Sequence, residues 1–202
     1  MNSGNTSSNG RTINVVGLAA GALMIILPFL GPWWMASVGT GAFEISLSPF
    51  DLSIMVFGQP IHSQLVDLLL LAAKIAMIIS GVFLILGSLS PKSWWSGRLV
   101  RFGVMKPLWA VIGIIIVVVL GAFFINNVLP GILSNAIPDG GASAQITVPY
   151  LVGSASATIQ MGSQASITAP INLSLTPVFW VAVVTAILGI VARINHRRLK
   201  KQ

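Results

Sequence analysis

The sequence predicts an integral membrane protein: a bundle of four transmembrane helices with a small extracytoplasmic antiparallel β-sheet built from both outer loops. Two observations favour this fold class, namely four long apolar stretches and basic residues that avoid the two long polar segments between them. Hydrophobic residues make up 55% of the chain and charged residues only 7%, and the mean hydropathy is +0.91. So few charged residues cannot cover the surface of a soluble domain of 202 residues.

Each apolar stretch is close to the ~20 residues that a helix needs to cross a bilayer, the last being the shortest. A cleaved signal peptide is the alternative for the first stretch, because a polar lead and Arg11 precede it. Its apolar core exceeds the usual ~7–15 residues, so we expect a retained helix. The four stretches are Thr12–Trp34, Leu65–Leu89, Leu108–Leu129 and Pro177–Ala192.

The charge distribution predicts the orientation. The segment 35–64 contains Glu44 and Asp51 but no Lys or Arg, and the segment 130–176 contains Asp139 as its only charged residue. Positive charge near helix ends stays in the cytoplasm, so we expect a multi-pass protein of the cell membrane with both termini cytoplasmic. The segments expected on the cytoplasmic side are 1–11, 90–107 and 193–202.

Alternation of apolar and polar residues predicts strands in both outer loops. Phe43–Ser48 and Leu52–Val56 alternate on either side of a Pro-Phe-Asp turn, which is typical of a hairpin. Pro170 cannot donate to a ladder, so we expect it at an edge or a bend. Residues 131–143 are rich in glycine and small residues and are expected to be irregular. Three further alternating runs are separated by Gly-Ser pairs, at Gln145–Tyr150, Ser156–Met161 and Gln164–Leu175.

An intramembrane polar cluster is the candidate site. Lys74 lies nine residues inside the second apolar stretch, close to mid-bilayer, where a lysine costs roughly 2.5–3.5 kcal/mol. Asp67 is two helical turns away on the same face, and Asn126 and Asn127 lie at a similar depth on the third stretch. Three interpretations are open: a structural clamp that fixes helix register, a contact with a partner subunit or lipid headgroup, and a transport or proton-relay site.

Small residues at four-residue spacing predict close helix packing in the first and fourth stretches. Tryptophans near the ends of the stretches are expected in aromatic belts at the two membrane interfaces. The expected packing residues are Gly17, Gly21, Ala182, Ala186 and Gly189, with further close approaches possible at Gly113 and Gly121. The expected belt residues are Trp33, Trp34, Phe179 and Trp180 on the outer side and Trp94, Trp95 and Trp109 on the inner side.

The residue types argue against catalysis. His62 and His196 are expected on opposite sides of the membrane, the acidic residues show no metal-ligand spacing, and no phosphate-binding glycine loop or cysteine is present. We therefore expect neither an enzyme nor a cofactor. A nucleic-acid partner is also not expected, because the basic residues flank helices.

Asn172-Leu-Ser174 is a possible glycosylation sequon on the outer side. It lies close to the last helix and in an expected strand. A second match, Asn5-Thr-Ser7, is expected in the cytoplasm and therefore unmodified.

Four helices, cytoplasmic termini, a short basic inner loop and an outer sheet from both loops resemble the claudin-like tetraspan proteins. The resemblance spans nearly the whole chain but rests on topology. Claudins have a tryptophan-rich signature and a cysteine pair in the first outer loop, whereas here Trp33-Trp34 ends a helix, cysteine is absent and the second loop is longer. No functional residue is carried over. The resemblance implies a scaffolding, adhesive or subunit-regulating protein.

The leading functional hypothesis is a non-catalytic membrane protein that acts through protein–protein contacts, as an accessory subunit or as a lateral or cell-surface assembly element. Its expected partners are membrane lipids and other membrane-protein subunits or copies of itself. One alternative is a small channel or carrier that uses Lys74 and Asp67. Another is a subunit of an energy-transducing enzyme whose cofactors lie in other chains.

Overall fold

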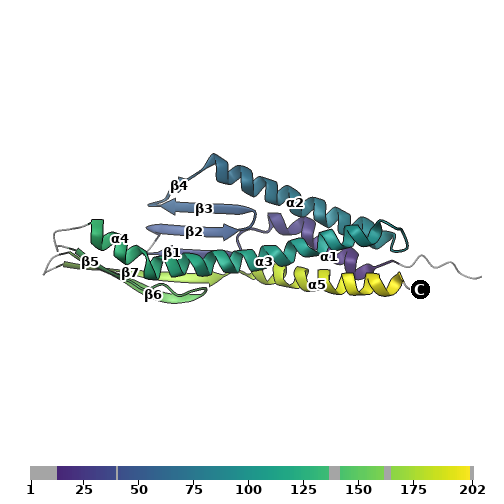
Figure 1. Ribbon diagram of the computed structural model, residues 1–202. Helices are drawn as coiled ribbons and strands as arrows, with labels where there is room; N and C mark the ends of the chain where they lie inside the picture. Colours follow the sequence, from purple (N-terminus) through teal and green to yellow (C-terminus); the bar gives the residue numbers. More distant parts are fainter. Residues whose placement is uncertain (1–12, 40, 137–141, 162–164, 201–202) are drawn as a thin grey trace, which may run out of the picture.

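The computed structural model describes residues 13–39, 41–136, 142–161 and 165–200. The molecule is elongated, with helices gathered at one end and a β-sheet at the other (Figure 1). Both ends of the described chain lie at the helical end. The helices are α1 (Val15–Ile26), continued by the short 3₁₀ helix η1 (Leu27–Phe29), α2 (Gln64–Leu89), α3 (Ser96–Asn127), α4 (Leu129–Ala136) and α5 (Pro177–Leu199).

Among the described residues, three helices are long and apolar enough to cross a membrane. These are α2 with 26 residues, α5 with 23, and α3, which continues through Ile132 for a total of 37. The expected first span is shorter than predicted, because α1 has 12 residues and η1 adds three. Pro28 lies in η1, where the α-helix tightens and ends. The structure thus supports three of the four predicted spans by length.

Two predicted boundaries are wrong. The connection expected over 90–107 is mostly helix, because α3 already begins at Ser96. The basic tail expected from residue 193 is helical as far as Leu199. Arginine, lysine and leucine are good helix formers, so the basic flanks extend the apolar helices instead of ending them. Pro107 lies inside α3, as membrane helices tolerate.

The α1–α2 contact is a close approach of two backbones. A Cβ added to Gly21 would lie 2.8 Å from the carbonyl oxygen of Gly81, and one added to Gly81 would lie 2.8 Å from that of Gly21. The contact between α2 and α3 is similar, since a Cβ on Gly103 would lie 2.8 Å from the carbonyl oxygen of Ser80. Packing of this kind depends on residues without a side chain.

The sheet has seven antiparallel strands in the order β4-β3-β2-β1-β7-β6-β5. The central strand β1 pairs with β2 on one side and β7 on the other, so that Trp34 lies opposite both Leu47 and Leu175. The segments before α2 and before α5 therefore share one sheet, as predicted. The strands are β1 (Trp34–Val38), β2 (Phe43–Ser48), β3 (Asp51–Val56), β4 (Gln59–Ile61), β5 (Ala142–Ile146), β6 (Gly153–Met161) and β7 (Ala165–Leu175).

The hairpin expected over residues 43–56 is present as β2 and β3. The prediction missed β1, whose residues were placed at a helix end, and β4, which follows a tight turn with positive φ at Phe57 and Gly58. The strand expected from Gln145 instead ends at Ile146 as part of β5. Part of the segment expected to be irregular forms α4 and the start of β5, and its residues 137–141 lie outside the described part of the chain.

Pro170 is in an interior strand, so of its two expected places, an edge or a bend, the edge is wrong. It lies in β7 opposite Ser156 of β6. On the β1 side its carbonyl oxygen accepts a hydrogen bond of 2.7 Å from Gly39 N, just beyond the last residue of β1. The missing N–H of Pro170 therefore falls where the β1–β7 ladder ends, and little pairing is lost.

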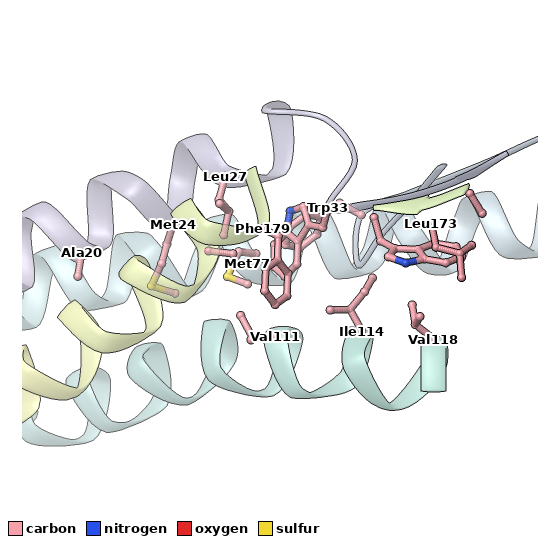
Figure 2. Packing of buried hydrophobic residues seen from close by; sticks show 14 of the residues in the cluster. Ala20, Met24, Leu27, Trp33, Met77, Val111, Ile114, Val118, Leu173 and Phe179 are labelled. Atoms are coloured by element: carbon pink, nitrogen blue, oxygen red, sulfur yellow. The ribbon is translucent and has the colours of Figure 1, made fainter. Parts of the chain in front are cut away.

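The core joins the helices to the base of the sheet. Trp33 has no exposed surface, and its ring meets that of Phe50 edge-on at a centroid distance of 5.7 Å. It meets the ring of Phe179 edge-on at 6.4 Å (Figure 2). Trp34 opens β1 and is also buried. The expected belt role of these two tryptophans and of the buried Phe179 is therefore wrong, because their rings fill the junction between the helices and the sheet.

Candidate functional site

The structure does not assemble the predicted polar cluster. Lys74 is half-buried on α2, and its ammonium lies 5.6 Å from the centroid of the Phe29 ring. Asp67 is exposed near the start of α2. In the described part of the chain, no ion pair joins the two, and both asparagines have other partners. The clamp of Lys74, Asp67 and an asparagine is therefore wrong.

The mid-bilayer depth of Lys74 stays a prediction, but its ring partner fixes its position along the helices. Phe29, its ring partner, ends η1 only five residues before β1 begins. From Leu89 at the far end of α2 to Lys74 is 15 residues, or about 22 Å at 1.5 Å per residue. The ammonium thus lies close to the level where the helices meet the sheet.

Replacing Lys74 by methionine is expected to change the unfolding free energy by less than about 1 kcal/mol, because a ring contact at a partly exposed site is worth roughly 0.5–1 kcal/mol. Unfolding of the purified protein in mixed micelles, with Lys74→Arg as the charge-preserving control, measures the difference. A loss of more than about 3 kcal/mol in the methionine variant alone would show that the cation has a buried partner.

Asn126, at the end of α3, acts as a backbone clamp. Its Nδ2 donates to the carbonyl oxygen of Val148 at 2.8 Å, and its Oδ1 accepts from the amide of Val148 at 2.7 Å. Trp34 fastens the same loop, since its indole N–H donates to the carbonyl oxygen of Leu151 at 2.8 Å. Asn127 only caps its own helix, donating to the carbonyl oxygen of Phe123 at 2.9 Å. The loop 147–152 is therefore held against both α3 and β1.

This loop borders an apolar cavity of about 350 Å³ between α3 and one face of the sheet. Alternate residues of β1 line it, including Ala36 and Val38, while Met35 and Ser37 face the other side. On the helix side the cavity meets residues of α3 such as Ala122, and every described side chain that lines it lacks an ionisable group. The cavity can accommodate an apolar group, but its lining offers no acid, base or nucleophile.

The opposite side of α3 is an uncovered apolar surface. Its side chains are about half exposed, from 48% to 59%. We refer to it as the α3 outer surface, formed by Leu120, Phe123 and Phe124. It extends alongside the sheet, beyond the region where α1 and α5 pack on α3 (Figure 1).

The predicted packing residues lie where helices meet. Ala182, Ala186 and Gly189 are buried on α5, and Gly17 and Gly21 are buried on α1. A Cβ on Gly113 or Gly121, by contrast, would meet nothing within 4 Å, so these two do not mark a close approach. The prediction missed Gly81 and Gly103, because neither has a small residue four positions away.

Asn172 lies in β7 on the polar face of the sheet. Its side chain is exposed, and its Oδ1 accepts a hydrogen bond of 2.8 Å from Ser154 Oγ. The strand is paired on both sides at this position, with Ser37 and Ser154. Glycosylation there stays a prediction, and the second sequon at Asn5 lies outside the described residues.

Within the described residues, no three His, Asp or Glu side chains come together in a way that could hold a metal ion. His62 is exposed just before α2, and His196 is buried near the end of α5. The absence of an enzymatic function and of a cofactor stays a prediction.

Comparison with known proteins finds no family model that matches the chain and no curated relative of significant similarity.

Proposed function

We propose that this chain is a non-catalytic multi-pass membrane protein that acts through protein–protein contacts. It serves as an accessory subunit of a membrane complex or as a lateral or cell-surface assembly element. The observation that carries the proposal is the α3 outer surface, which is apolar, half exposed and beside the sheet.

Bilayer geometry supports the need for a protein partner. The helix through Ile132 has 37 residues, about 55 Å at 1.5 Å per residue, whereas the hydrocarbon core is ~30 Å thick. An open sheet with unpaired edge strands is not tolerated in hydrocarbon, so the part of α3 that packs on the sheet belongs outside it. Lipid tails then cannot cover the α3 outer surface. Exposed apolar patches of this kind mark interaction sites.

A four-pass topology with the sheet outside the cell membrane and both termini in the cytoplasm belongs to the same proposal. The chain from Asn14 to Trp33 travels the length of the helical end, although α1 is short. Asn14 donates to the carbonyl oxygen of Ala192, and Trp33 meets Phe179, which lies 13 residues earlier on α5. Basic residues lie at the Asn14 end, consistent with a cytoplasmic side. The shared sheet is consistent with the claudin-like resemblance.

Site-specific photo-crosslinking in native membranes tests the proposal. A photoreactive amino acid at Leu120 or Phe124 is expected to give an adduct of one defined mass. The same group at Ile187 of α5, which is 54% exposed, is the matched control and is expected to give only lipid adducts. Mass spectrometry of the adduct distinguishes a second copy of the chain from a different subunit.

Two outcomes would contradict the proposal. The first is crosslinking of equal yield and heterogeneous mass at Leu120, Phe124 and Ile187, which would indicate random collision. The second is flux of an ion or solute into liposomes that contain only the purified chain, if the Lys74→Met variant abolishes this flux. That result would favour the channel or carrier hypothesis.

A further inference from the structure

The helical end contains a basic groove of about 440 Å³ between the start of α3 and the end of α5. Four basic side chains, three arginines and a lysine, line it together with one histidine. They come from two helices whose contributing residues are almost 100 positions apart in sequence. The basic groove is formed by Arg101 of α3 and by Arg193, His196, Arg197 and Lys200 of α5 and its C-terminal end.

The floor of the basic groove is a fixed structure. His196 is 3% exposed, and its Nε2 lies 3.2 Å from Ser96 Oγ. The Ser96 hydroxyl also lies within hydrogen-bond distance of the carbonyl oxygens of Pro91 and Ser93, which anchor it to the α2–α3 connection. Nδ1 of His196 is buried without a hydrogen-bond partner among the described residues.

Lys200 and the N-terminus of α3 add positive electrostatic potential to the basic groove. A Cβ on Gly97 would lie 4.0 Å from both Nε2 of His196 and Nζ of Lys200, so the ammonium lies over the first turn of α3. The amides of Ser96, Arg98 and Leu99 already donate to the carbonyl oxygens of Ser93 and Trp95. The helix N-terminus therefore contributes the positive end of the helix dipole, which favours anions. The groove therefore combines side-chain cations with a helix N-terminus.

The cations of the basic groove have no counter-charge within the described part of the chain. None of them forms an ion pair there, and the described acidic residues lie in the sheet or at the far end of α2, at Glu44, Asp51 and Asp67. Two neighbouring cations each contact an aromatic ring instead. Arg98 lies 5.7 Å from the Trp94 ring and Lys106 lies 5.2 Å from the Phe102 ring.

We propose that the basic groove between α3 and α5 binds the phosphate headgroup of an anionic phospholipid. Converging guanidinium groups match the oxygens of a phosphate, which they bind through paired N–H donors. A lipid is the favoured source because α3 and α5 continue from the groove as apolar helices with exposed side chains, such as Trp109 and Ile190. A headgroup in the groove can thus leave its acyl chains along these helices. Basic pockets between membrane helices bind anionic headgroups in this way.

Lipid binding to the full chain in a neutral detergent tests the proposal. Phosphatidylglycerol is expected to raise the thermal unfolding midpoint and to remain bound in native mass spectra, whereas phosphatidylcholine at the same concentration is not. In Arg101→Gln/Arg197→Gln the affinity for phosphatidylglycerol is expected to fall about tenfold or more. Lys200→Gln is a second, milder variant at an exposed position and is expected to weaken binding by a smaller factor.

The matched control is Arg98→Gln/Arg198→Gln, which removes the same charge from adjacent exposed positions outside the groove. Its affinity is expected to stay within about twofold of the wild type. An equal loss of affinity for phosphatidylglycerol in the two double variants would show that the lipid is attracted by the overall positive charge of the surface. That result would overturn the proposal. The same midpoint shift with inorganic phosphate alone would overturn the lipid assignment, and so would an unchanged wild-type midpoint with phosphatidylglycerol.

Discussion

Replacing Gly81 by alanine is expected to destabilise the helical end by about 1–3 kcal/mol, the usual cost of overpacking. The new methyl group would lie 2.8 Å from the carbonyl oxygen of Gly21, 2.9 Å from Cγ1 of Ile25 and 3.2 Å from Cβ of Met24. The first of these is backbone and cannot rotate away, so α1 and α2 must separate. The midpoint of unfolding in mixed micelles measures the loss.

Gly113→Ala is the matched control for this substitution. Gly113 is also an interior helix glycine, but a Cβ there would meet nothing within 4 Å. Alanine has the better helix propensity by up to ~1 kcal/mol, so this variant is expected to be neutral or slightly more stable. Equal behaviour of the two variants would contradict the close α1–α2 contact.

Replacing Asn126 by alanine is expected to cost about 2–4 kcal/mol and to free the loop 147–152. The substitution removes the partners of both the amide and the carbonyl oxygen of Val148, which is 8% exposed. A buried polar group left without a partner costs about 1–3 kcal/mol. Hydrogen exchange of the Val148 amide is expected to accelerate, and the loop is expected to become sensitive to protease.

Asn127→Ala tests whether this effect belongs to one side chain. Asn127 is the next residue, is exposed and bonds only to its own helix. Its replacement is expected to change stability by less than about 0.5 kcal/mol. If both variants released the loop 147–152 to the same extent, the result would contradict the Asn126–Val148 clamp. It would show that the end of α3 as a whole holds the loop.

The sequence predicts the chemistry of the elements better than their limits. Alternation in residues 43–56 identified β2 and β3, because one face of each strand is apolar and partly buried and the other is largely polar. The same rule missed β1, since Trp34–Val38 follows directly on an apolar helix and carries too few polar residues to interrupt the pattern. It also extended the first helix too far, because Pro28 ends α1 within an unbroken apolar stretch.

The candidate site was predicted less well, because its contacts depend on three-dimensional arrangement. Lys74 and Asp67 share a helix face by spacing, but nothing in the sequence shows that Phe29 reaches the lysine. Asn126 was singled out as a polar residue in an apolar stretch, and the structure gives it a specific hydrogen-bonding role. Its partner is the backbone of Val148. Because nearly every residue has the same backbone groups, the sequence does not show which of them the side chain binds.

The pairing of β1 on both sides has a consequence for biosynthesis. The strand becomes available as soon as Val38 has been synthesised, but its second neighbour is complete only at Leu175. During the intervening 137 residues, a nascent chain carries β1 with an unsatisfied edge beside an already formed hairpin. The sheet is therefore complete only when synthesis reaches the last helix. Premature termination leaves β1 with an unpaired edge, which chaperones or proteases can recognise.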